Sequence, residues 1–120
     1  METVHRPCDF TIAICTYNGA QRLPAVFEHL KQQLGTQGIR WEILVIDNNS
    51  SDATADVVNQ YQQNWPTESP LHYLFEKRQG AAYARQLAMK TARSELVGFL
   101  DDDNLPNEHW VAAAYKFGQN

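Results

Sequence analysis

Residues 10–30, FTIAICTYNGAQRLPAVFEHL, set a pattern that the rest of the chain repeats. Phe10–Cys15 is nearly continuous in apolar or small residues, as expected for a strand that is covered on both faces, and Asn18-Gly19 ends it. The apolar side chains that follow keep a helical spacing up to Leu34, so the sequence predicts a helix that ends before Gly35. This stretch therefore indicates a buried strand followed by a helix that covers the sheet.

Strand-length and helix-length segments alternate up to the last residues. This order predicts an α/β fold with a Rossmann-like open, mainly parallel sheet of about four strands and helices on both faces. Because 120 residues make about one domain, we expect residues 1–120 to form a single domain. Further strands are expected at Trp41–Ile46, Leu71–Phe75 and Leu96–Leu100, and further helices from residue 51 to Trp65, between Gly80 and Ala92, and from Pro106 through an inward-facing Phe117.

The composition excludes several classes of protein. A formal net charge of −4 argues against a general binder of nucleic acid or of anionic membranes, so any anion site must be local. The longest apolar stretches are far shorter than the roughly 20 residues that span a bilayer, and the first residues lack the layout of a secretion signal. We expect no transmembrane segment and a cytoplasmic protein, or one at the inner membrane face in a longer form. Its two cysteines, Cys8 and Cys15, are expected to stay reduced, with Cys15 in the core.

Polar residues directly follow three of the expected strands. They are Thr-Tyr-Asn at 16–18, Asp-Asn-Asn at 47–49 and three aspartates at 101–103. Ligands of open parallel sheets bind outside the carboxyl ends of the strands, where loops and helix N-termini converge. We therefore expect one edge of the sheet to gather all three groups.

Asp101, Asp102 and Asp103 repel one another unless a cation or basic side chains neutralise them. Mg²⁺ and Mn²⁺ prefer oxygen ligands, and Mg²⁺ sites use one or two carboxylates together with phosphate and water. Asp101 and Asp103 can face the same way in a strand-to-turn geometry, while Asp102 points elsewhere. The triplet alone supports equally well a solvated acidic turn that caps the helix expected from Pro106.

The other polar segments allow two interpretations each. Asp47 to Ser50 suits ribose hydroxyls or a base edge, but helix capping gives the same pattern and is favoured locally. Thr16 to Gly19 could lay a tyrosine ring against a planar ligand or form only a tight loop. Residues 76–93 hold five basic residues and one glutamate. They could hold a diphosphate near Gly80, with Arg85 and Lys77 as the likelier ligands, or form a solvated helix face. The four histidines lack metal-ligand spacing, and each is expected at the surface or satisfied in the core.

Three segments of the chain resemble the family 2 glycosyltransferases of the GT-A fold. They are TIAICTYNGA at 11–20, EILVIDNNSSDATADVV at 42–58 and GAAYARQLAMKTARSELVGFLDDDNLP at 80–106, in the order and approximate spacing of that family. The resemblance implies a nucleotide-diphospho-sugar donor, with a UDP-sugar as the first expectation, and a glycan or lipid-linked glycan as acceptor. It also implies Mg²⁺ or Mn²⁺ as cofactor.

The resemblance also assigns roles to residues. The aspartates after the fourth strand correspond to the family's DxD motif, so Asp101 and Asp103 are expected to hold the divalent ion and Asp102 to lie near the ribose or the sugar. Two positions depart from the usual pattern, since Asn48 replaces a second aspartate and Gln86 an asparagine. The remaining residues expected to bind the nucleotide-sugar are Thr16, Tyr17, Asn18, Asp47, Asn48, Gly80 and Arg85.

The implied reaction is a metal-assisted displacement at the anomeric carbon of the sugar, with inversion of configuration, as part of polysaccharide or glycan synthesis. The general base that activates the acceptor hydroxyl is expected beyond Asn120, because family members are longer and this chain resembles their donor-binding half. A face left open by the missing half could favour a homo-oligomer. Two alternatives stay open, a nucleotide-binding module without catalysis and, disfavoured by the net charge, a nucleic-acid-binding domain that uses the helix around Arg85.

Overall fold

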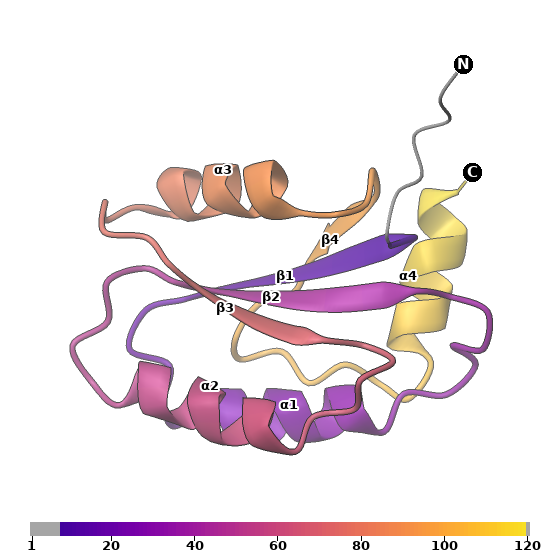
Figure 1. Cartoon of the computed structure of the whole chain (residues 1–120), viewed down its shortest axis with the longest axis horizontal. Helices are drawn as coiled ribbons and strands as arrows, with labels where there is room; N and C mark the ends of the chain where they lie inside the picture. The colour runs from indigo at the N-terminus through magenta and orange to yellow at the C-terminus, as the bar shows by residue number, and fades with distance from the viewer. Residues whose placement is uncertain (1–7, 120) are drawn as a thin grey trace.

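The structure, a computed structural model, describes residues 8–119, which alternate strand and helix throughout (Figure 1). This alternation confirms the predicted α/β fold. None of the helices in this part of the chain is long and apolar enough to cross a membrane. The elements are β1 (Phe10–Thr16), α1 (Leu23–Lys31), β2 (Trp41–Asp47), α2 (Thr54–Gln63), β3 (Leu71–Phe75), α3 (Ala81–Thr91), β4 (Val97–Phe99) and α4 (Trp110–Gly118).

The strands form one sheet in the order β3-β2-β1-β4, and every neighbouring pair is parallel. β1 and β2 are paired along their whole length, so that Thr16 lies opposite Asp47 at their carboxyl ends. β2 is buried at every position because it lies inside the sheet with helices on both faces. All the loops that follow the strands therefore begin at the same edge of the sheet.

The helices divide between the two faces of the sheet. Figure 1 shows α3 on one face and α1 with α2 on the other. Because side chains alternate along a strand, Ile12 and Ile14 pack in the larger core with α1 and α2, whereas Ala13 packs with Ala84 and Ala88 of α3. The small side chains of α3 face the sheet, as the sequence predicts.

Several helix ends differ from the sequence prediction. The helix expected from residue 51 to Trp65 runs only from Thr54 to Gln63. The first helix stops at Lys31, so Leu34 lies beyond it and is 49% exposed. The last helix begins at Trp110, not near Pro106, and Phe117 is 83% exposed instead of facing inward. Contacts between distant segments accompany the ends of α1 and α4. The backbone oxygens of residues 107 and 108 accept hydrogen bonds from the Gln33 side chain and the Leu34 N–H (2.7 Å each), and the residue 107 oxygen also accepts one from the Trp110 N–H (3.1 Å).

Candidate functional site

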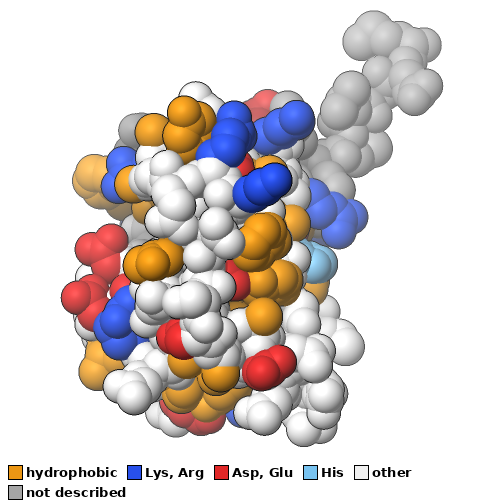
Figure 2. Space-filling view, turned by 90° about the vertical axis from the view of Figure 1, so that its left-hand side faces the viewer, with side chains coloured by type: hydrophobic (Ala, Val, Ile, Leu, Met, Phe, Trp, Pro, Cys, Tyr) orange, Lys and Arg blue, Asp and Glu red, His pale blue; other side chains and the backbone are white. Residues whose placement is uncertain are grey.

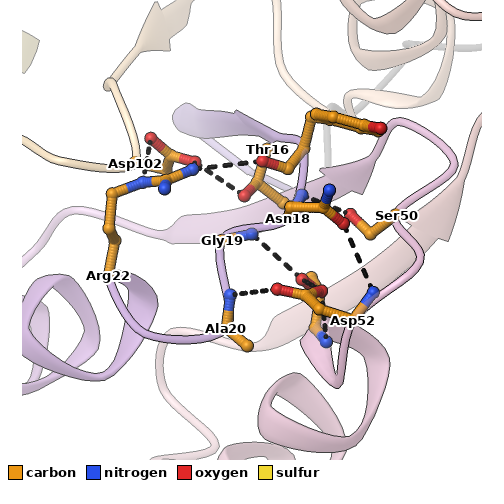
Figure 3. Close-up of polar contacts among 10 residues, drawn as sticks. Thr16, Asn18, Gly19, Ala20, Arg22, Ser50, Asp52 and Asp102 are labelled. Carbon is orange, nitrogen blue, oxygen red and sulfur yellow. Dashed lines mark hydrogen bonds and ion pairs between the residues drawn. The ribbon is translucent and has the colours of Figure 1, made fainter.

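The three polar groups predicted to meet do meet at the carboxyl edge of the sheet. This edge faces the viewer in Figure 2, where acidic side chains gather at one side and basic side chains gather at the top, over α3. The loop after β1 spans residues 17–22, the loop after β2 spans residues 48–53, and the turn after β4 includes residues 101–103. Side-chain hydrogen bonds join the first loop to both others (Figure 3).

Asn18 fastens the loop after β1 to the loop after β2. Its backbone has a positive φ of 51°, a conformation that asparagine tolerates better than most residues. Its Oδ1 accepts hydrogen bonds from the backbone N–H of Ser51 (2.8 Å) and Asp52 (3.3 Å), and its own N–H donates to Ser50 Oγ (2.8 Å). Asn18 therefore joins the two loops through its Oδ1 and its backbone N–H, and it fixes the position of its neighbour Tyr17.

Asp102 fastens the aspartate turn to the loop after β1. Thr16 Oγ1 donates to Asp102 Oδ2 (2.7 Å), and Arg22 donates to both oxygens, from Nε to Oδ1 (3.2 Å) and from Nη2 to Oδ2 (2.9 Å). Arg22 also donates to the carbonyl of Tyr17 (3.1 Å). The Asp102 carboxylate raises the pKa of Arg22. Sequence reasoning missed Arg22, since nothing in its local pattern indicates a partner 80 residues away.

Asp101 and Asp103, on either side of Asp102, are both exposed. Within residues 8–119, no hydrogen bond or ion pair engages either carboxylate. In the same residues, no three His, Cys, Asp or Glu side chains gather as a ready-made metal cage. Two free carboxylates fit the way Mg²⁺ is usually bound, with one or two protein carboxylates and the remaining ligands from phosphate and water.

Asp47 is buried at the end of β2 and accepts two hydrogen bonds. Tyr73 donates its hydroxyl to Oδ2 (2.6 Å), and the backbone N–H of Ser50 donates to Oδ1 (3.0 Å). Burial and the contact with Asp47 raise the pKa of the Tyr73 hydroxyl, which therefore stays protonated as a donor. Each Asp47 oxygen has a further lone pair with which it can accept a hydrogen bond from a ligand.

Asn48 organises the loop between β3 and α3. Its Nδ2 donates to the carbonyls of Glu76 (3.2 Å) and Arg78 (2.7 Å), while its Oδ1 accepts from the N–H of Gly80 (2.9 Å). Gln79 Nε2 donates in turn to the Asn48 carbonyl (2.7 Å). These contacts bring the amino end of α3 to the carboxyl edge of the sheet. The Asn48 side chain, expected to touch the ligand, uses its polar atoms to hold this loop.

A pocket of about 210 Å³ lies between the end of β1 and the start of α3. Burial raises the pKa of Cys15, which lines the pocket, and the positive charge of Arg85 partly opposes this rise, so Arg85 is close to the pocket. The Arg85 guanidinium lies 5.3 Å from the Phe99 ring centroid. Cys15 lines the pocket and is only partly buried, less than predicted. A larger hollow of about 400 Å³ lies at the opposite edge, beside Cys8 and Asp9, and touches none of the predicted site residues. The smaller pocket is lined by Cys15, Thr16, Tyr17, Asn48, Ala81 and Ala84.

Glu76 gives this loop a predictable response to acid. Its carboxylate accepts hydrogen bonds from Arg78 at the backbone N (2.9 Å), Nε (3.2 Å) and Nη2 (3.0 Å), and these contacts lower the pKa of Glu76. Because the pKa of Glu76 is lower in the folded than in the unfolded protein, ionised Glu76 stabilises the fold at pH values above its unfolded-state pKa. This stabilisation is lost as the pH falls through the folded-state pKa.

We expect Glu76→Gln to lower the unfolding free energy at pH 7 and to lose less stability than the wild type below about pH 4.5. Urea unfolding between pH 3 and pH 7 measures this difference. Glu68→Gln is the matched control, since Glu68 is exposed and its carboxylate accepts, among residues 8–119, a hydrogen bond from Thr67 alone (3.4 Å). Equal pH dependence of the wild type and Glu76→Gln would contradict the assignment.

Comparison with known proteins gives the family. The family described as "Glycosyl transferase family 2" matches residues 11–119. The chain belongs to this glycosyltransferase family. It is 29% identical over 110 residues to the uncharacterized glycosyltransferase YfnE of Bacillus subtilis (92% of this chain, 27% of YfnE). It is 26% identical over 102 residues to the glycosyltransferase AglE of Haloferax volcanii (84% of this chain, 32% of AglE).

Solved structures agree with this family of glycosyltransferases. Staphylococcus aureus TarS 1–349 in complex with UDP has a TM-score of 0.77 at 25% identity, over 91% of this chain and 31% of TarS. The mannosyltransferase PcManGT from Pyrobaculum calidifontis, in complex with GDP-Man and Mn²⁺, has the same TM-score and identity, over 92% of this chain and 32% of PcManGT. The chain thus spans about a quarter to a third of the length of these proteins.

The residues that the sequence assigned to the nucleotide-sugar site differ in what their side chains do. Most of them lie at one edge of the sheet; Gly80 precedes α3 at this edge, and Arg85 of α3 lies near Cys15 at the end of β1. Asn18, Asn48 and Asp102 hold loops together, whereas Asp101, Asp103 and Tyr17 are exposed. The residues of the edge that sequence reasoning did not assign are Arg22, Thr54, Tyr73 and Gln79.

Proposed function

We propose that this chain is the part of a glycosyltransferase that binds a nucleotide-diphospho-sugar, from which the whole enzyme transfers the sugar to an acceptor hydroxyl. The observation that carries the proposal is the pair of free carboxylates, Asp101 and Asp103, held by Asp102 beside the loop of Thr16 and Tyr17. The complexes of TarS with UDP and of PcManGT with GDP-Man and Mn²⁺ support this ligand class.

Different residues of the site would bind different parts of the nucleotide-sugar. Asp47 offers its remaining lone pairs to the nucleoside, and the exposed ring of Tyr17 provides an apolar surface for a planar group. The amino end of α3, an eleven-residue helix that begins after Gly80, favours the negative charge of the diphosphate. Arg85, within the first turns of the same helix, adds a positive charge.

Asp101 and Asp103 would hold Mg²⁺ or Mn²⁺. Such an ion stabilises the negative charge of the departing nucleoside diphosphate. We assign no residue of this chain to the general base. The proposal includes inversion of configuration at the sugar and a role in polysaccharide or glycan synthesis. The acceptor, the cytoplasmic location and self-association stay predictions.

Calorimetric titration of the chain with UDP, GDP and dTDP tests the proposal. We expect at least one nucleoside diphosphate to bind in the presence of Mn²⁺ and binding to disappear when EDTA removes the ion. No binding of any of the three, or the same affinity with and without EDTA, would contradict it. UDP-sugars and GDP-sugars would then show which donor binds best.

A further inference from the structure

A second group of chemistry-bearing side chains lies on the face of the sheet that α3 covers, away from the carboxyl edge. Glu42 belongs to the start of β2 and His72 to the edge strand β3, where His72 pairs with Leu44. Both line a pocket of about 320 Å³, which also includes Leu74, Thr91 and the exposed Arg93. None of the residues proposed to contact the nucleotide-sugar lines this pocket, although Tyr73, which donates its hydroxyl to Asp47, does line it.

Glu42 is a fully buried carboxylate with only one oxygen satisfied. Its side chain is 0% exposed, and Oε2 accepts hydrogen bonds from Thr11 Oγ1 (2.8 Å) and from the backbone N–H of Arg93 (2.8 Å). Oε1 has no hydrogen-bond partner. Burying a carboxylate oxygen without a partner is costly, so this position favours a ligand that can bind it.

The atom that faces this oxygen has no hydrogen bond either, and the two atoms form an ion pair only when His72 is protonated. His72 Nε2 is buried without a hydrogen bond, although the whole side chain is 39% exposed, and it lies 3.6 Å from Glu42 Oε1. His72 is thus neither a plain surface residue nor a satisfied core residue, the two alternatives expected from the sequence. A neutral imidazole with its proton on Nδ1 presents the Nε2 lone pair to the same space as the carboxylate oxygen.

The spacing of these two atoms suits a transition-metal ion. Two ligand atoms bound at about 2.1 Å to one tetrahedral Zn²⁺ lie about 3.4 Å apart. Glu42 Oε1 and His72 Nε2 are 3.6 Å apart. Imidazole nitrogen selects zinc over the harder Mg²⁺, which prefers oxygen ligands. We propose that Glu42 and His72 form a two-residue Zn²⁺ site, with water in the pocket as the other ligands.

The surroundings limit how tightly this site binds. No third His, Cys, Asp or Glu joins the pair within residues 8–119, so binding should be weaker than at a structural zinc site with four protein ligands. Arg93 also lines the pocket. Burial and the Glu42 carboxylate raise the pKa of Cys8, and the positive charge of Arg93 partly opposes this rise. The positive charge of Arg93 weakens the binding of a cation further. The site does not depend on the proposed nucleotide-binding function.

Titration of the metal-free chain with Zn²⁺ tests the site. We follow the imidazole nitrogen and carbon signals of the histidines by NMR and the affinity by calorimetry. We expect the His72 signals to move first, His72→Ala to weaken binding by about tenfold or more, and Mg²⁺ to leave the His72 signals in place. An Asp101→Asn, Asp103→Asn double variant should keep the response of the His72 signals to Zn²⁺, although Zn²⁺ can also bind at those two carboxylates, and this readout separates the site from the nucleotide-sugar site.

His109→Ala is the matched control. His109 Nε2 and Glu108 Oε1 are also 3.6 Å apart, but both side chains are 64% exposed, so their polar atoms are free to bind water. We expect His109→Ala to bind Zn²⁺ like the wild type. His72 signals that do not respond to Zn²⁺, or an equal loss of affinity in His72→Ala and His109→Ala, would overturn the proposal. His72→Gln provides a second, polar replacement, for which we expect the same loss.

Discussion

Replacing Gly19 by alanine should lower the unfolding free energy by about 2 kcal/mol, because the new methyl group overpacks a closed site. A Cβ at this position would lie 2.0 Å from Thr16 Oγ1 and 3.0 Å from Asp102 Oδ2. Thr16 is buried, and its hydroxyl would have to leave the 2.7 Å hydrogen bond to Asp102. We therefore expect both a less stable fold and a looser aspartate turn, measured by urea unfolding and by Mn²⁺-dependent nucleotide affinity.

The variant Thr16→Ala supplies the control. It removes the atom that the new methyl group meets first, so Gly19→Ala should cost much less in a Thr16→Ala background than alone. The cost of the double variant should then be close to that of Thr16→Ala. Strictly additive costs would show that the contact with Thr16 is not the cause.

Replacing Asp101 or Asp103 by asparagine should weaken Mn²⁺-dependent binding of a nucleoside diphosphate by about tenfold or more for each residue. Both carboxylates are exposed, and neither has a partner within residues 8–119, so the unfolding free energy should change by less than about 0.5 kcal/mol. Calorimetry and urea unfolding measure the two effects separately.

Asp56→Asn is a suitable comparison for these variants. Asp56 is an exposed carboxylate in the first turn of α2, a different part of the chain from the aspartate turn. We expect it to leave nucleotide binding unchanged. Asp101→Asn and Asp103→Asn proteins that bind the nucleoside diphosphate as tightly as the wild type would remove both residues from the site.

The sheet could be predicted from the sequence because two signals in the sequence indicate each of its central strands. β1 and β2 are apolar at nearly every position, and each is followed at once by polar residues and a helical period. The ends of α1 and α4 could not be predicted in the same way. They are accompanied by hydrogen bonds between residues 33–34 and 107–108, which are distant in sequence and leave no local pattern.

The position of the candidate site followed from topology, whereas the roles of its side chains did not. Parallel strands guarantee that Thr16, Asp47 and Asp101 share an edge. Which side chains point outward depends on pairs such as Thr16 with Asp102, separated by 86 residues. Asp102 and Asn48 were both expected to touch the ligand, and both have polar atoms bonded within the protein.

The most direct measurement of the central claim uses Mn²⁺ itself as a probe. Paramagnetic Mn²⁺ broadens the NMR signals of nearby residues, so we would record backbone amide spectra of the chain with Mn²⁺ and UDP or GDP. The account predicts that residues 16–19 and 101–104 broaden first and that the nucleotide strengthens this effect. Broadening centred on the hollow beside Cys8 and Asp9, or no dependence on the nucleotide, would contradict it.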